Sequence, residues 1–504
     1  MEYNAANAWN VNFGSGNVNN NNKYNGYAAR AVVALSDQVK KEWVEAYEDC
    51  CRHKMTSLQC TLYRLAVEDD LFALAYEVYH YTYTISTSVT FVVKYPKYRE
   101  IFAANFRDRI VQHWIVMRIN PFFERRFHEL GDVSYNCRLG FGTLAAVQRA
   151  QFEIARISQN YAVPTRLGLI DISSFFMTID REVCWELLEP FIREHADEIL
   201  EMYPGTDIEV LIWVTHLTVM NSPQEDCVKN GELSLWAFLS PMKSFFTLPP
   251  GMGLPIGNIT SQLIANFLLS FLDEYLLEIC RERGAIILRF VDDILIIART
   301  AEDVVFIRQA ADWFLREKLH QKLHPDKFNI QEAHKGVKFI GAVIKPGRTY
   351  TSNRTVGGFY NAIAGIEDAC RLLVEYGITP QRLTSLDHYV ASMNSYFGFT
   401  VHTASYNVRK RLISRLRYFW KVCYIVNLSQ VRIRKKYRFS TNLIQEEYED
   451  YITKPSGTGP DFAEPLSPAL PHRQLRHRVQ PLHEDVPVRE RRPRARLLEQ
   501  GRRH

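Results

Sequence analysis

The segment ILRFVDDILIIA (residues 287–298) constrains the fold most strongly, because it places two adjacent carboxylates between two apolar runs. Such a pattern predicts a β-hairpin with Asp292 and Asp293 at its tip. An Asp-Asp turn taken alone is usually an ordinary polar turn. A charged pair so close to a buried sheet is costly, however, unless the pair binds cations. The segment therefore predicts a sheet and directs attention to other carboxylates.

A third carboxylate, Asp171, stands at the end of an apolar strand in LGLIDISSFFMTID (residues 167–180). Beside the hairpin tip it would complete a site for two magnesium ions, one activating an attacking hydroxyl and the other steadying a leaving phosphate. Alternate residues at a strand end point to opposite sides, so we expect Asp292 to matter more than Asp293. Alone, Asp171 is equally well explained as a helix N-cap.

The loop GMGLPIGNITSQ (residues 251–262) precedes an amphipathic helix. Its glycines allow the backbone to approach a base pair or a phosphate closely, and the first amides of the helix favour anions. A plain loop that caps a core helix is the alternative.

In this order and spacing, the three segments resemble the reverse transcriptase family over roughly residues 90–420. Asp171 matches the first catalytic aspartate, and FVDD matches the Tyr-x-Asp-Asp box with Phe in place of Tyr. LPIGNITSQ matches the loop usually written Leu-Pro-Gln-Gly-x-x-x-Ser-Pro. Further similarities lie in the fingers motifs RDRIVQHWI and SYNCRLGFGTLAAV and in the later palm motifs LHPDK and GVKFIGAVI.

The resemblance implies an α+β right-hand polymerase with fingers, a palm built on an antiparallel sheet, and a helical thumb. At 504 residues, two or three domains are expected. The expected divisions are an Asn-rich leader (1–35), a helical N-terminal region with fingers (36–165), the palm (166–350), a basic helical thumb (351–440) and a Pro/Arg-rich tail (441–504). The composition of the leader and the tail predicts disorder. Candidate core positions of the helical N-terminal region are Trp43, Tyr47, Leu62, Leu65 and Leu71.

The resemblance also assigns roles to single residues. Two Mg²⁺ ions are held by Asp171, Ile172, Asp292 and Asp293, and the partners are template RNA, cDNA and deoxynucleoside triphosphates. The substrate-binding candidates are Arg138 on the triphosphate, Phe176 as a gate against the 2′-hydroxyl, Ile256, Gly257 and Gln262 in the loop, and Lys327 near the leaving pyrophosphate. Phe176 as core, and Arg138 and Lys327 as surface charges, are the alternatives. Related sequences often carry Lys where this one has Leu139 and Phe141, so we expect fewer contacts between the protein and the triphosphate.

A basic, aromatic stretch runs from His388 to Gln445 without an acidic residue. Basic groups bind phosphates, and aromatic faces stack on bases. A solvated helix face is the alternative. The nucleic-acid-binding candidates in this stretch are Arg409, Lys410, Arg411, Arg415, Arg417 and Lys421.

Two departures in the loop refine the resemblance, because Ile256 stands where Gln is usual and Gln262 where Pro is usual. This combination is similar to reverse transcriptases of diversity-generating retroelements, which copy a template repeat into cDNA with errors at template adenines. The leader segment AWNVNFGSGNVNNNNKYNGYAARAV looks like the end of the lectin-fold or formylglycine-generating-enzyme-like proteins that these elements diversify. Asn codons begin with two adenines, as an adenine-rich template requires. A low-complexity leader is the alternative.

That family implies a small helical accessory protein and a bacterial or phage setting. Two rival functions remain: a retron-, intron- or defence-type reverse transcriptase of ordinary fidelity, and a non-catalytic RNA-binding protein on the same scaffold. The sequence shows no signal-peptide pattern and no membrane-length apolar stretch, and its nine cysteines are scattered. We therefore expect a cytoplasmic protein with reduced thiols. Cys50, Cys51, His53 and Cys60 lack a CxxC pair, which disfavours zinc.

Overall fold

The computed structural model describes residues 35–52, 58–65, 67–94 and 97–438. These residues fall in one compact unit that ends at Arg438. The predicted leader (apart from Leu35) and the predicted tail lie outside the described residues, as does His53 of the zinc candidate. Within the described part of the chain, no helix is both long and apolar enough to cross a membrane.

Three helices open the described chain: α2 (Asp37–Cys51), α3 (Leu58–Tyr63) and α4 (Val67–Tyr79). The side chain of Ser36 caps α2 by accepting a hydrogen bond from the Val39 amide. Trp43 of α2 is fully buried and stacks on Trp114, with ring centroids 5.4 Å apart. Leu62 and Leu65 are 56% and 80% exposed, so their prediction as core was wrong. The short helix α3 instead turns Cys60 inward.

A three-stranded sheet, here called the fingers sheet, interrupts the N-terminal region that was expected to be helical. Its strands, in the order β2-β1-β4, are β2 (Arg99–Ala103), β1 (Ser88–Val93) and β4 (Cys227–Lys229). The run SVTFVV is rich in β-branched residues and alternates buried and half-buried positions, which favours a strand. Strands β1 and β2 are antiparallel, whereas β4 joins β1 in parallel from more than a hundred residues away.

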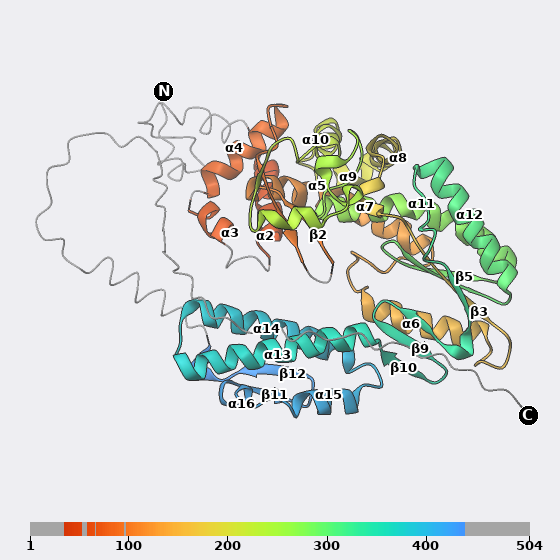
Figure 1. The fold of residues 1–504 in the computed structure, drawn as a ribbon. Helices are drawn as coiled ribbons and strands as arrows, with labels where there is room; N and C mark the ends of the chain where they lie inside the picture. The colour runs from red at the N-terminus through yellow and green to blue at the C-terminus, as the bar shows by residue number, and fades with distance from the viewer. Residues whose placement is uncertain (1–34, 53–57, 66, 95–96, 439–504) are drawn as a thin grey trace, which may run out of the picture. The chain divides into compact units, whose positions relative to one another are not determined.

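The palm sheet is antiparallel throughout, as predicted. Its strands, in the order β5-β6-β3-β7, are β5 (Ile286–Phe290), β6 (Asp293–Ala298), β3 (Arg166–Asp171) and β7 (Asn329–Glu332). Ile294 and Ile296 pack into the core that contains α11 (Ile259–Arg283) and α12 (Ala301–Leu319). Leu295 and Ile297 pack on the other face with α6 (Thr143–Ile157). Figure 1 shows α6 beside the palm strands, on the side away from α11 and α12. Both faces are therefore covered, which explains why β6 is continuously apolar.

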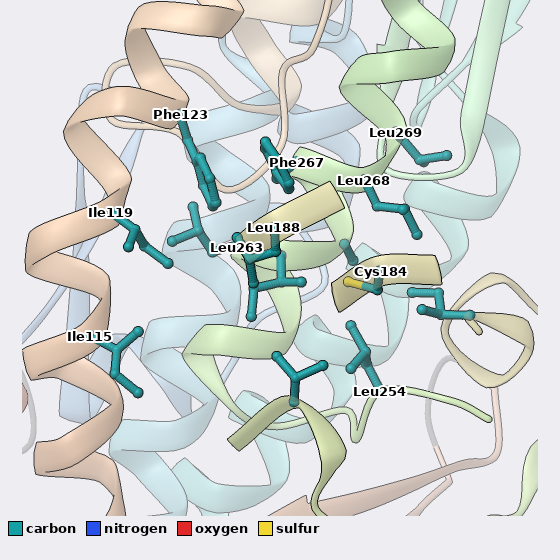
Figure 2. Packing of buried hydrophobic residues seen from close by; sticks show 14 of the residues in the cluster. Ile115, Ile119, Phe123, Cys184, Leu188, Leu254, Leu263, Phe267, Leu268 and Leu269 are labelled. Atoms are coloured by element: carbon teal, nitrogen blue, oxygen red, sulfur yellow. The ribbon is translucent and has the colours of Figure 1, made fainter. Parts of the chain in front are cut away.

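The main core lies between α11, α5 (Phe106–Glu129) and α8 (Arg181–Glu194). Phe123 of α5 stacks on Phe267 of α11, with ring centroids 4.3 Å apart. Figure 2 shows Leu254, from the loop before α11, reaching the same cluster as Cys184 and Leu188 of α8. The buried Leu254 side chain therefore fixes the loop that also carries Ile256 and Gly257, which were predicted to contact substrate. The remaining elements of this region are α7 (Phe175–Thr178), α9 (Ala196–Met202) and α10 (Ile208–Met220).

A further antiparallel sheet follows the palm: β8 (Val337–Phe339), β9 (Ala342–Lys345) and β10 (Arg348–Thr351). The segment GVKFIGAVI, which was matched to a later palm motif, forms two strands, β8 and most of β9. The chain reverses at Ile340 and Gly341, where φ is 33° and 86°. The glycine tolerates this conformation. The apolar residues around it give no turn signal in the sequence.

The last described region has its own core, which includes Phe359, Leu386 and Phe419. Its helices are α13 (Asn353–Tyr376), α14 (Pro380–Thr400), α15 (Tyr406–Ile413) and α16 (Phe419–Val422). A hairpin of β11 (Cys423–Val426) and β12 (Gln430–Ile433) then closes the region, where only helix was expected. Its turn uses Asn427 and Leu428 with positive φ, and a leucine gives no turn signal in the sequence.

Candidate active site

The structure brings the three predicted carboxylates to one end of the palm sheet. Asp171 is the last residue of β3 and Asp293 the first of β6, and the two are direct antiparallel partners. Asp292 lies in the turn between β5 and β6, beside Val291. The cross-strand neighbour of Asp171 is thus Asp293. The greater importance of Asp292 stays a prediction.

Two of the carboxylates, Asp292 and Asp293, have a raised pKa. Burial is the largest cause of the raised pKa of Asp292, and the charge of Asp171 adds to it. Burial, with the charges of Asp292 and Asp171, raises the pKa of Asp293 to about 6. Crowded carboxylates of this kind lack enough positive charge, and a bound cation is the usual remedy.

Lys327 supplies part of the missing charge. Its Nζ donates to Oδ2 of Asp171 at 2.6 Å, and its charge lowers the pKa of both Asp292 and Asp293. The ion pair is at the rim of a cavity of ≈ 280 Å³ that is also lined by Asp293, Asp326 and Lys338. The sequence-predicted palm lysine therefore lies at the carboxylates themselves.

The donor set at this end of the sheet fits a hard divalent cation, because it consists of carboxylate and main-chain oxygens. Ile172 and Leu323 face each other in an isolated antiparallel bridge. The Asp171 carbonyl and the Ser173 amide make the hydrogen bonds of this bridge, so the Ile172 carbonyl takes no part in them. In the described part of the chain, no three His, Cys, Asp or Glu side chains already form a metal-binding cluster. Lys327 occupies Oδ2 of Asp171, so it competes with a cation for that oxygen.

Phe176 lies on α7, just after Asp171. Its ring is half-buried against the main core and meets the buried ring of Phe175 edge-on at 5.2 Å. The carbonyl of Phe176 accepts from the Leu254 amide at 2.8 Å, and the Gly253 amide donates to Ile179 at 2.7 Å. The glycine-rich loop is thereby bonded to the segment that follows Asp171.

The loop residues contact the fingers sheet. The carbonyl of Ile256 accepts from the Phe102 amide at 2.9 Å, on the free edge of β2, and the Ile256 side chain packs near Phe102 and Phe245. Gly257 has φ +126°, and a Cβ there would lie 2.5 Å from the Phe102 carbonyl oxygen. The close approach that the glycine permits is thus to β2. Gln262 is exposed, and its Oε1 accepts from the Cys137 thiol at 3.3 Å.

Comparison with known proteins decides the family. The model of the family described as reverse transcriptase (RNA-dependent DNA polymerase) matches residues 93–344, which is half of the chain. The chain belongs to the reverse transcriptase family. It therefore carries the domain of RNA-directed DNA polymerases, and the right-hand polymerase fold predicted from the motifs is confirmed. Reverse transcriptases generally use divalent metal ions.

Individual relatives of this reverse transcriptase are distant. Protein YkfC of Escherichia coli (strain K12) is 24% identical over 291 residues, which cover 52% of this chain and 67% of that protein. Apo telomerase from Candida tropicalis is similar with a TM-score of 0.41 and 10% identity, over 66% of this chain and 58% of that one. Telomerase from Candida albicans, solved with a fragment of telomeric RNA, gives a TM-score of 0.36 and 10% identity. The match covers 66% of this chain and only 59% of the latter.

Arg138 does not have the environment expected of a triphosphate ligand. Its side chain is fully buried, and its guanidinium donates to Glu124 at 2.8 Å and to Asp132 at 2.7 Å. It also lies 3.9 Å from the ring centroid of Phe141. In this arrangement no donor of Arg138 reaches solvent, so the residue holds the fingers segment together.

Arg99 was missed by the sequence interpretation. It is the exposed first residue of β2, and its positive charge lowers the pKa of Asp292. An exposed cation whose charge acts on Asp292 is better placed for a triphosphate than the buried Arg138. The signal available in the sequence was a basic residue in a β-rich segment that shortly precedes the RDRIVQHWI motif.

A buried ionic network holds the turn between β5 and β6 in this reverse transcriptase. Arg289 and Asp273 are both buried, with Nη2–Oδ2 and Nε–Oδ1 distances of 2.5 and 2.8 Å. Nη1 of Arg289 donates to Asn266 at 2.9 Å and to the Val291 carbonyl at 3.2 Å. Val291 has φ 57°, a strained conformation for a β-branched residue. The network thus holds the turn that carries Asp292.

The thumb candidates divide into two groups. Arg409 is 8% exposed, and its Nη1 donates to the Leu428 carbonyl at 2.8 Å, so it supports the turn between β11 and β12. Its prediction as a nucleic-acid ligand does not fit this environment. The other five candidates are exposed, and their role in nucleic-acid binding stays a prediction: Lys410, Arg411, Arg415, Arg417 and Lys421. In the zinc candidate, the Cys60 thiol donates to Cys51 Sγ at 3.4 Å.

Proposed function

We propose that this reverse transcriptase belongs to a diversity-generating retroelement and copies a template-repeat RNA into cDNA with errors opposite template adenines. The observation that carries the polymerase activity is the meeting of Asp171, Asp292 and Asp293, with Lys327, at one end of the palm sheet. The substrates are template RNA, a primer and deoxynucleoside triphosphates.

The residues of the site have distinct tasks. Asp171, Asp292, Asp293 and the Ile172 carbonyl would hold two Mg²⁺ ions, which activate the primer hydroxyl and stabilise the leaving pyrophosphate when bound. Lys327 carries a proton on Nζ, 2.6 Å from Asp171, and can give it to the leaving group once it is released from that carboxylate. Phe176 excludes the 2′-hydroxyl, and the exposed cation Arg99 binds the triphosphate.

Lowered fidelity is proposed from Ile256. The loop that carries it is bonded to β2 through the Ile256 carbonyl and to α7 through the Leu254 amide, next to the carboxylates. The side chain offers bulk but no hydrogen bond, whereas the family residue at this place is an amide. A lost polar contact is worth about 1–3 kcal/mol, or roughly 10- to 100-fold in error rate.

The test compares cDNA made by the unmutated protein and by Ile256→Gln on one adenine-containing template, with the accessory protein and the native RNA present. We expect Ile256→Gln to make fewer errors, chiefly opposite adenine, with a modest change in total synthesis. Ile256→Met is the matched control, because it keeps an apolar side chain and should keep the errors. This separates polarity from packing against Phe102.

The outcomes also separate the rival functions. Equal error spectra in all three proteins would remove Ile256 from the mechanism. Accurate synthesis opposite adenine by the unmutated protein would leave a reverse transcriptase of ordinary fidelity, and a search for an adenine-mismatched repeat pair in the flanking DNA gives an independent check. The small helical accessory protein is part of this proposal. The three intact carboxylates argue against a non-catalytic RNA-binding protein.

A further inference from the structure

A small polar cavity adjoins the loop that carries Ile256 and Gly257. Its volume is ≈ 10 Å³, and its walls come from α5, from the first turn of α11, from β1, from the end of α10 and from Ala104. A cavity of this size has room for about one water molecule. Buried polar groups need hydrogen-bond partners, so a polar lining favours a polar ligand. The buried polar residues in the lining are Ser88, Asp108, Gln112, Asn258, Thr260 and Ser261.

Asn258 occupies the N-cap position of α11, but its side chain does not cap the helix. Asparagine is a preferred N-cap residue, because its side-chain oxygen accepts from the first amides of a helix. Asn105 caps α5 in this way, with Oδ1 3.1 Å from the Arg107 amide nitrogen. Asn258 is 8% exposed and lines the cavity instead, and within the described ranges its side chain has no hydrogen-bond partner. The first amides of α11 and the Asn258 side chain therefore both need another partner.

Asp108 provides the carboxylate in the lining and is 2% exposed. Its Oδ1 accepts from the Tyr83 hydroxyl at 2.7 Å and from the Ser86 hydroxyl at 3.2 Å. Its Oδ2 accepts from the Ser86 amide at 3.0 Å. A carboxylate offers about four acceptor positions, two on each oxygen. One position, on Oδ2, therefore remains for a further donor.

The lining combines groups that favour opposite ligands. The carboxylate of Asp108 favours a cation or a hydrogen-bond donor. The start of α11 carries partial positive charge and free amides, so it favours an anion or an acceptor. An ion of either sign satisfies one group and is repelled by the other. A water molecule is neutral and both donates and accepts, and a buried water needs two to four polar partners such as these.

The cavity lies next to the contact between the loop and the fingers sheet. The Ile256 carbonyl accepts from the Phe102 amide at 2.9 Å. Two residues further along each segment, Asn258 and Ala104 line the cavity. Gly257 lies between, where a Cβ would be 2.5 Å from the Phe102 carbonyl oxygen. A ligand in the cavity therefore acts on the backbone that sets the position of Ile256.

We propose that this cavity binds one internal water molecule, which joins Asp108 to Asn258 and to the first turn of α11. Asp108 is then a positioning residue: through the water it holds the loop that presents Ile256 and Gly257 to the substrate. The inference rests on the proposed polymerase function and adds to it a group, outside the catalytic carboxylates, that acts on substrate binding.

The direct test is a crystal structure of the full-length protein at a resolution that shows ordered water. We expect one water within hydrogen-bond distance of Asp108 Oδ2 and of the Asn258 side chain. A metal ion in the cavity, or an Asn258 side chain that caps α11 itself, would overturn the inference. This test needs no variant and no activity, so it stands even if the unmutated protein makes no DNA on a primed template and the polymerase proposal fails.

Kinetics test the positioning role. We expect Asn258→Ala to raise the KM for deoxynucleoside triphosphates roughly 3- to 10-fold, which is the worth of one hydrogen bond, with a smaller change in kcat. Asn105→Ala is the matched control: it removes an asparagine that does cap its helix, so it should lower the melting temperature and leave the KM unchanged. An unchanged KM in Asn258→Ala, or an equal rise in Asn105→Ala, would remove the positioning role.

A double variant tests whether the two residues act through one water. Asp108→Asn alone should also raise the KM. Because both side chains hold the same molecule, the double variant Asp108→Asn with Asn258→Ala should have a KM close to that of the weaker-binding single variant. Effects that multiply in the double variant would mean that the residues act independently, which contradicts the inference. If Asp108→Asn fails to fold, the crystal structure and the asparagine pair still decide.

Discussion

Asp273 is the residue whose replacement tests the positioning network most severely. The Asp273 carboxylate is 1% exposed and compensates the fully buried guanidinium of Arg289. Asp273→Asn keeps the shape of the side chain but leaves a buried positive charge without a counter-ion. The same guanidinium donates to the carbonyl of Val291, in the turn that carries Asp292.

The magnitude follows from burial. Breaking a fully buried ion pair by removing one partner costs about 3–5 kcal/mol. Holding Val291 at φ 57° stores strain of order 1–3 kcal/mol, which the network must continue to balance. We therefore expect Asp273→Asn to lower the melting temperature by several degrees and to reduce the single-turnover rate of primer extension.

A double variant distinguishes positioning from simple stability. Arg289→Met with Asp273→Leu replaces the pair by apolar side chains and should recover most of the lost stability. Its polymerase rate should stay low, because nothing then donates to the Val291 carbonyl. The assays are thermal unfolding followed by circular dichroism and rapid-quench primer extension. Unchanged melting in Asp273→Asn, or a double variant that recovers stability and rate together, would refute the reasoning.

Two further predictions concern substrate binding. Arg99→Ala should raise the KM for deoxynucleoside triphosphates and leave the melting temperature unchanged. Arg138→Ala should lower the melting temperature, because it leaves Glu124 and Asp132 without their ion-pair partner. Steady-state kinetics and thermal unfolding of both variants check this, and a KM effect confined to Arg138→Ala would reverse the assignment. Phe176→Val should admit ribonucleotides by opening space for the 2′-hydroxyl; competition between ribo- and deoxynucleotides measures it, and unchanged sugar selectivity would make Phe176 a core residue.

The sequence predicted those features that depend on local patterns. Apolar runs around Asp292 and Asp293 specify a hairpin, and an apolar strand that ends at Asp171 specifies its partner. That the two lie side by side was expected from the resemblance of the ordered motifs to reverse transcriptases. The helices after Ser352 likewise follow from continuous helical periodicity.

Features that depend on distant partners could not be predicted. Arg138 and Arg409 look like surface cations in the sequence, and only the fold brings Glu124 to one and the Leu428 carbonyl to the other. The parallel pairing of β1 with β4 joins segments far apart in the chain, and no local pattern encodes it. Gly257 was predicted to permit a close approach, but the sequence does not reveal that β2 is the group approached.

The central claim is that the carboxylates at the end of the palm sheet hold the ions that catalyse DNA synthesis. The direct measurement is primer extension on an RNA template by Asp292→Asn, which keeps the shape of Asp292 but removes its charge. We predict a loss of roughly 1,000-fold or more, because the ions supply several kcal/mol of transition-state stabilisation. Melting in EDTA should be unchanged or higher, since burial and Asp171 disfavour the charged form of Asp292. Synthesis at the unmutated rate by the folded variant would contradict the account.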